Sequence, residues 1–135
     1  MEPEIKIRGY HTDIYQHVNN ARYLEFLEEG RWQLFDDHVD MQIFTEKGLA
    51  FFVVNINISY KSQTKVNDVI IIKSGLLKTG NKSGILKQQV INKHTGEICV
   101  DADVTFVIVN SERKSIQISG EVKDILSKIP EFKGI

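Results

Sequence analysis

The chain has 135 residues, a formal net charge of −1, 41% hydrophobic residues and 26% charged residues. This balance excludes a disordered chain, and the lack of a broad positive charge argues against nucleic acid or an anionic membrane surface as the main partner. The length predicts a single domain over residues 1–135 with one hydrophobic core.

Cysteine content and hydropathy bear on the compartment. No apolar run approaches the ~18 residues that a membrane-spanning helix requires, so we expect no stable membrane insertion. The first residues, M-E-P-E-I-K-I-R, lack the apolar stretch of a secretory signal. Cys99 is the only cysteine and cannot form an internal disulfide. Together these features predict a cytoplasmic protein.

The first predicted elements are a strand and a long helix. Residues 5–10 alternate apolar and polar positions, as in a strand with one buried face. From Asn20 the pattern becomes helical, and either Asn19 or Asn20 suits the N-cap. The polar stripe of this helix contains Arg22, Glu25, Glu29, Gln33 and Asp36, and the opposite, apolar face contains Leu24, Leu27, Leu34 and Phe35.

Four strands and a short helix are predicted for the remainder. The strands span residues 49–60, 69–77, 84–92 and 97–109, and the helix spans residues 121–128. The connections after the second and third of these strands are short, which favours antiparallel hairpins. The predicted fold class is therefore α+β, in which a curved five-stranded antiparallel sheet wraps a central apolar helix that must be covered.

Residues 9–23, which read G-Y-H-T-D-I-Y-Q-H-V-N-N-A-R-Y, place a carboxylate and two imidazoles beside a helix N-terminus. The unpaired N–H groups of such a terminus can hold an oxygen that becomes negative during acyl transfer, and Asp13 could act as a nucleophile or a base. By composition alone, an aspartate before a helix is usually a turn residue. The spacing of His11, Asp13 and His17 matches no metal signature, so we predict no metal and no cofactor.

The order of Asp13, Asn20-Ala-Arg-Tyr23 and Glu28-x-x-Arg31 resembles the 4-hydroxybenzoyl-CoA thioesterase family, whose members have the hotdog fold. The run from Arg8 to Glu29 is similar to that of the bacterial long-chain acyl-CoA thioesterases that act beside fatty-acid β-oxidation. The resemblance implies hydrolysis of long-chain fatty acyl-CoA to free acid and coenzyme A. It also implies that a homodimer or homotetramer is the assembly.

The resemblance also assigns roles to residues. Asp13 corresponds to the family carboxylate, and the backbone N–H of Asn20 corresponds to the group that faces the thioester oxygen. His17 is the third catalytic candidate, because plant acyl-carrier-protein thioesterases share Q-H-V-N-N, although Tyr15 stands where they have asparagine. We expect substrate contacts from Tyr15, Tyr23 and Lys61. Lys61 could reach the phosphates of coenzyme A, but isolated surface lysines are usually only solvated.

Two features of the apolar segments carry further predictions. Arg31 lies on the apolar side of the helix and needs a partner, for which Glu28 is the candidate by i,i+3 spacing. The run of residues 49–54, L-A-F-F-V-V, could line an acyl tunnel and favour long chains.

Two other functions fit the same fold. An acyl-CoA hydratase or dehydratase would carry D-x-N-P-x-H or H-x-F-P, whereas this chain has D-I-Y-Q-H. A non-catalytic acyl-CoA-binding protein would be expected to carry an effector domain, for which 135 residues leave no room.

Overall fold

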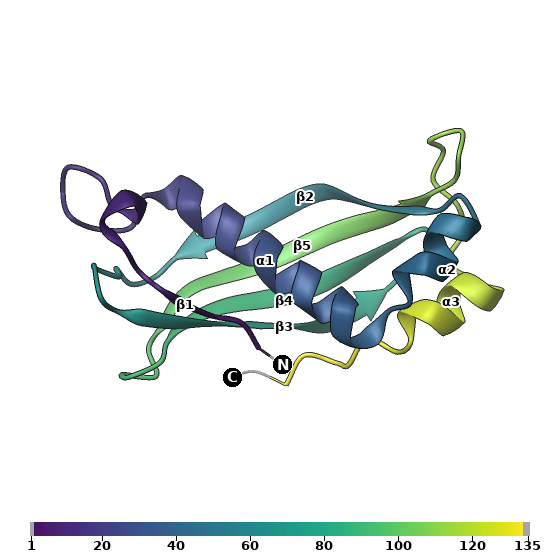
Figure 1. Ribbon diagram of the computed structural model, residues 1–135. Helices are drawn as coiled ribbons and strands as arrows, with labels where there is room; N and C mark the ends of the chain where they lie inside the picture. The colour runs from purple at the N-terminus through teal and green to yellow at the C-terminus, as the bar shows by residue number, and fades with distance from the viewer. Residues whose placement is uncertain (1, 134–135) are drawn as a thin grey trace.

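The computed structural model describes residues 2–133, which form one antiparallel sheet curled around a long helix (Figure 1). The strand order across the sheet is β1-β3-β4-β5-β2. The predicted α+β architecture is confirmed. The elements in chain order are β1 (Glu4–Lys6), a 3-10 turn (Gly9–His11), α1 (Asn20–His38), α2 (Met41–Glu46), β2 (Ala50–Tyr60), β3 (Val69–Thr79), β4 (Ser83–Asn92), β5 (Ile98–Val109) and α3 (Gly120–Leu126).

Helix α1 crosses the concave face of the sheet and begins where the capping pattern predicts. The Asn19 side chain accepts a hydrogen bond from the Ala21 backbone N–H at 2.9 Å, so Asn19 rather than Asn20 is the N-cap. The buried face of the helix includes Leu27, Leu34 and Phe35, as predicted. Leu24, which the helical pattern assigned to that face, is 40% exposed, which corrects that part of the prediction.

The long strands agree with their predicted ranges to within two residues at each end. The first strand is a correction, because pairing with β3 ends at Lys6 and the chain then turns through residues 9–11 instead of continuing to Tyr10. Helix α2 was not predicted; it is short, and Asp40 caps it by accepting from the N–H groups of Gln42 and Ile43. The terminal helix α3 begins one residue before the predicted start and ends two residues before the predicted end.

Helix α1 packs tightly against the sheet at Gly30. A Cβ at this position would lie 2.5 Å from Ile72 Cγ2 and 2.9 Å from Gln88 Nε2, so only glycine fits. The contact separates two clusters of buried apolar side chains, one under each half of α1. The polar side chain of Gln88 is therefore held against the middle of α1, in the interior of the protein.

Candidate active site

The residues that carry the predicted chemistry lie on a tight loop before α1. Thr12 and Val18 form an antiparallel bridge, and within it the Asp13 N–H donates to the His17 carbonyl at 3.0 Å. Gln16 closes the turn with a φ of 63°, a left-handed conformation that is uncommon for a residue other than glycine. The loop thus holds Asp13 opposite His17 by backbone hydrogen bonds.

The Asp13 carboxylate is exposed and only partly engaged. Its Oδ1 accepts from the Tyr15 backbone N–H at 2.9 Å, an Asx turn that fixes the side chain. Its Oδ2 makes no hydrogen bond to the residues that the structure describes. One carboxylate oxygen therefore stays available to a ligand or a water molecule.

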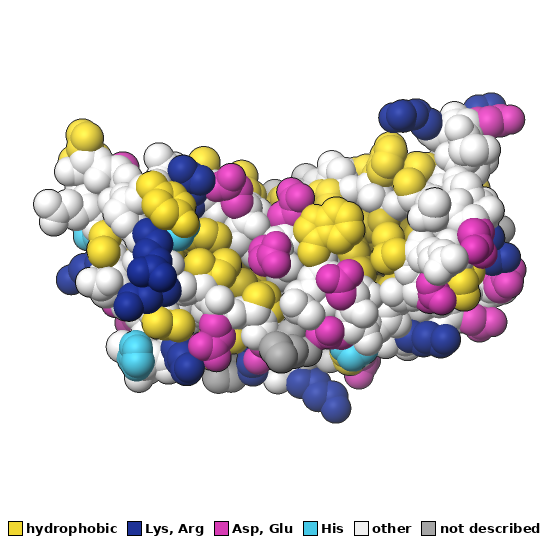
Figure 2. All heavy atoms as spheres, in the orientation of Figure 1, with side chains coloured by type: hydrophobic (Ala, Val, Ile, Leu, Met, Phe, Trp, Pro, Cys, Tyr) yellow, Lys and Arg dark blue, Asp and Glu magenta, His cyan; other side chains and the backbone are white. Residues whose placement is uncertain are grey.

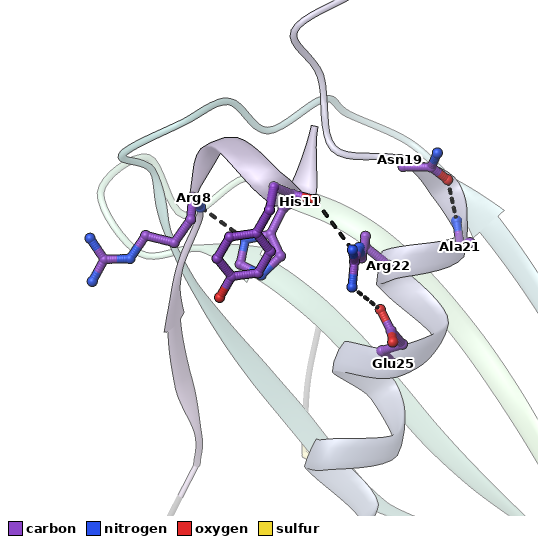
Figure 3. Close-up of polar contacts among 7 residues, drawn as sticks. Arg8, His11, Asn19, Ala21, Arg22 and Glu25 are labelled. Carbon is purple, nitrogen blue, oxygen red and sulfur yellow. Dashed lines mark hydrogen bonds and ion pairs between the residues drawn. The ribbon is translucent and has the colours of Figure 1, made fainter. Parts of the chain in front are cut away.

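The base of the loop rests on a buried histidine (Figure 3). His11 is 6% exposed, and its Nδ1 accepts from the Arg8 backbone N–H at 2.9 Å, so the neutral ring carries its proton on Nε2. Phe26 packs edge-on against the ring at 5.2 Å between centroids. Burial, with the neighbouring Arg22 as a second cause, lowers the pKa of His11 below its ordinary value. His11 supports the loop and does not face the Asp13 carboxylate pocket.

The loop, the start of α1 and the segment after β2 enclose an open pocket of about 360 Å³. It brings together Asp13, Tyr15, His17 and Asn20, four of the six predicted site residues. The Asn20 N–H, in the first turn of α1, has no acceptor among the described residues. Gln63 also lines the pocket, although no motif marked it in the sequence.

The other two predicted substrate contacts lie outside this pocket. Tyr23 is 2% exposed, and its hydroxyl is hydrogen-bonded to Thr64 Oγ1 at 2.6 Å, so its ring has no surface for a substrate. Burial is the main cause that raises the pKa of Tyr23. Thr64 in turn accepts from the Val18 N–H at 3.0 Å and ties the Asp13 loop to the segment after β2. Lys61 is exposed at the start of that segment.

Arg31 corrects a second prediction. The residue is 9% exposed, and its Nη1 donates to Gln88 Oε1 at 3.0 Å, not to Glu28. Glu28 lies on the exposed side of α1, where its Oε2 accepts from the Trp32 indole N–H at 3.3 Å. Burial lowers the pKa of Arg31, and the charge of Glu28 partly opposes this change. The i,i+3 spacing brings Glu28 near Arg31, but the neighbouring strand supplies the direct partner.

A larger pocket, of about 440 Å³, lies between α1, α2 and β2. Its walls are mainly apolar and include Phe35, Leu49 and Phe51 from these elements. In Figure 2, hydrophobic side chains gather over the region between α1 and β2. This apolar pocket shares no lining residue with the Asp13 pocket.

Two other classes of site are absent from the residues that the structure describes. In residues 2–133, no helix is long and apolar enough to cross a membrane. Over the same residues, no three His, Cys, Asp or Glu side chains lie in an arrangement that could hold a metal ion. Cys99 is buried, and burial raises the pKa of its thiol to about 11, which disfavours the reactive thiolate.

A five-stranded antiparallel sheet curled around one long helix is the architecture of the hotdog class. The chain belongs to the thioesterase-like superfamily, which it matches over residues 7–132. The family predicted from the Asp13 motif is thereby confirmed.

Individual relatives agree with this assignment. The chain is 43% identical over 130 residues to the long-chain acyl-CoA thioesterase FadM of Escherichia coli (strain K12), covering 96% of this chain and 98% of FadM. The crystal structure of the Escherichia coli probable thioesterase YbaW superposes with a TM-score of 0.91 at 42% identity, covering 97% and 99% of the two chains. The 12:0-ACP thioesterase from Umbellularia californica shares the fold, with a TM-score of 0.85 at 15% identity over 94% of this chain and 49% of that one.

Proposed function

We propose that this protein hydrolyses long-chain fatty acyl-CoA thioesters to the free fatty acid and coenzyme A. The observation that carries the proposal is the exposed Asp13 carboxylate, which shares a single pocket with Asn20, whose N–H has no acceptor among residues 2–133. The membership of a thioesterase superfamily and the 43% identity to a long-chain acyl-CoA thioesterase support the same activity.

In the proposed reaction, the thioester carbonyl oxygen accepts a hydrogen bond from the Asn20 N–H, next to the positive end of the α1 dipole. Asp13 either attacks the carbonyl carbon, which gives an acyl anhydride that water then hydrolyses, or removes a proton from the attacking water. In both routes the carbon–sulfur bond breaks, and the coenzyme A thiolate leaves and is protonated. His17 and Tyr15 flank Asp13 and are proposed to contact the reacting group and the substrate.

The apolar pocket supports the long-chain part of the proposal. Its lining includes Leu49, Ala50, Phe51 and Val53, from the segment that the sequence analysis assigned to an acyl tunnel. Along α1 the distance from Asn20 to Arg31 is about 16 Å at the helical rise of about 1.5 Å per residue. An acetyl group cannot span this distance, whereas a long acyl chain can.

We also propose a homodimer or homotetramer in the cytoplasm. Strand β2 is an edge strand that pairs with β5 on one side, and Val54 on it is 58% exposed, which suits pairing with a second copy. Light scattering on the purified protein would measure its mass, and a monomeric mass would contradict this proposal. The single free cysteine, Cys99, fits a reducing compartment. Lys61 is proposed to contact the coenzyme A phosphates from outside the Asp13 pocket.

Replacement of Asp13 by asparagine tests the proposed function. Asparagine keeps the shape and can still accept from the Tyr15 N–H, but it is neither a nucleophile nor a base, so hydrolysis of palmitoyl-CoA should fall at least ~100-fold. Release of free thiol would be measured on folded protein, with acetyl-, octanoyl-, palmitoyl- and benzoyl-CoA as substrates. Activity within a few-fold of wild type would remove Asp13 from the mechanism, and a preference for acetyl- or benzoyl-CoA would contradict the long-chain substrate.

A further inference from the structure

The apolar pocket between α1, α2 and β2 contains two charged side chains that the proposed hydrolysis does not use. Arg31 and Glu28, both from α1, line it together with Trp32, Phe35 and Phe51. A charged group in a mainly apolar wall is costly unless it meets a polar partner. The chemistry of this pair therefore indicates what the pocket is built to receive.

The position of Arg31 is fixed from behind. Gln88 is fully buried, and its Nε2 donates to the Leu27 carbonyl at 2.8 Å and to Ser74 Oγ at 2.8 Å. These two bonds orient the side-chain amide so that Oε1 faces Arg31 and accepts from Nη1 at 3.0 Å. Guanidinium has five N–H donors. The remaining donors of Arg31 have no acceptor among residues 2–133, while the side chain lines the pocket.

Glu28 supplies an acceptor at the same pocket. One carboxylate oxygen, Oε2, accepts from the Trp32 indole N–H at 3.3 Å, which holds the side chain beside the opening. In the described part of the chain, Glu28 and Arg31 do not pair directly, although the charge of Glu28 acts to raise the pKa of Arg31. The pocket thus offers a hydrogen-bond donor and a hydrogen-bond acceptor whose charges sum to zero.

We propose that this pocket binds an alkyl chain that carries a hydroxyl group. The hydroxyl oxygen accepts from the Arg31 guanidinium, and the hydroxyl proton is donated to the Glu28 carboxylate, while the apolar walls cover the alkyl chain. An unsubstituted chain would offer no partner to the remaining Arg31 donors or to the second Glu28 carboxylate oxygen once water is displaced, and a carboxylate would be repelled by Glu28. The extension to catalysis rests on the proposed function and makes hydroxylated long-chain acyl-CoA the preferred substrate.

Binding can be measured without any catalytic step, because Trp32 is the single tryptophan of the chain and lines the pocket. Its fluorescence would be followed during titration with 1-decanol, decanoate and decyltrimethylammonium. The alcohol should bind at least ~10-fold more tightly than either ion, which is the discrimination typical of a matched buried hydrogen-bond pair. Equal or tighter binding of decanoate, or the lack of a saturable response to the alcohol, would overturn the proposal.

Glu28→Gln tests the acceptor role, with Glu29→Gln as the matched control. Glutamine at position 28 keeps the bond from Trp32 but removes the negative charge, so decanoate should gain at least ~10-fold relative to 1-decanol. Glu29 is the next carboxylate on α1 and does not line the pocket, so its replacement should leave the ratio unchanged. A similar change in both variants would show a general charge effect and would contradict the specific contact.

The catalytic extension needs a comparison of 16-hydroxypalmitoyl-CoA with palmitoyl-CoA. The ratio of their kcat/KM values should favour the hydroxylated ester in the wild type and fall to about 1 in Arg31→Met, whose side chain has no donor. Thermal melting would show whether this variant is folded; if it is not, Glu28→Gln supplies the decisive ratio. If the wild type hydrolyses palmitoyl-CoA and 16-hydroxypalmitoyl-CoA equally well, the hydroxyl site is contradicted and the proposed function stands. Alcohol binding without hydrolysis of either ester would contradict the proposed function alone.

Discussion

At its N-terminus, α1 carries an exposed polar loop that backbone hydrogen bonds hold in place, whereas its C-terminal half carries a buried guanidinium held by a side chain from β4. In the loop, the hydrogen bond from the Tyr15 N–H engages one Asp13 carboxylate oxygen, and no other residue among 2–133 bonds the second oxygen. Around Arg31, each hydrogen bond spans elements far apart in the sequence. One helix can therefore carry a site open to solvent at its N-terminus and a largely buried charged group, held by a neighbouring strand, further along its length.

The largest loss of stability is expected around the buried Arg31 on α1. Gln88→Leu keeps the volume similar but removes the acceptor of Arg31, which leaves a buried cation without its hydrogen bond. We expect a loss of ~3 kcal/mol in the free energy of unfolding, measured by urea denaturation. Gln42→Leu, at an exposed position on α2, should cost less than ~0.5 kcal/mol. A loss below ~1 kcal/mol for Gln88→Leu would mean that Arg31 finds a solvent partner.

A smaller loss of stability is expected when the attachment of the Asp13 loop to the segment after β2 is weakened. Thr64→Val keeps the shape of the side chain but removes the hydroxyl that bonds the buried Tyr23 hydroxyl, so ~1–2 kcal/mol of stability should be lost. The Val18 amide, which donates to the Thr64 carbonyl, should also exchange its hydrogen faster. Thr105→Val on β5 is a matched control, since no described residue bonds its hydroxyl. Equal losses for both variants would argue against the Tyr23–Thr64 bond as an anchor.

The loop should also weaken in acid. The folded protein holds the pKa of His11 below the ordinary value of 6.5, chiefly by burial, so the unfolded chain takes up the proton first. The stability that neutral His11 contributes is complete above pH 6.5 and is lost as pH falls through the lowered pKa. Urea denaturation at a series of pH values would show this slope in the wild type and a shallower slope in His11→Phe. Parallel slopes would show that His11 does not link the loop to pH.

The smallest effect on stability is expected for Glu28→Gln. The side chain is exposed and Gln88, not Glu28, bonds Arg31, so the free energy of unfolding should change by only a few tenths of a kcal/mol. A loss of ~3 kcal/mol in denaturant melting would restore the buried ion pair that the sequence suggested. This substitution therefore separates a stability role for Glu28 from the ligand contact proposed above.

Local patterns in the sequence were sufficient for much of the fold and for the position of the candidate site. The asparagine cap, the helical stripe and the alternation of the strands act over a few residues, so the start of α1 and the four long strands could be predicted. The Asp13 motif identified the family for the same reason, since its residues are contiguous. The single domain over residues 1–135 stays a prediction.

Tertiary structure decided what depends on contacts between distant residues. The partner of Arg31 is 57 residues away on β4, and the residue that hydrogen-bonds the Tyr23 hydroxyl is 41 residues away, so sequence spacing could name neither. The sequence indicated that the apolar run of residues 49–54 could line an acyl tunnel, but it could not show that this run forms a pocket with α2, which was not predicted. The periodicity of a sequence indicates which face of a helix or strand is buried. Which residue contacts a buried side chain depends on how the sheet curls around the helix.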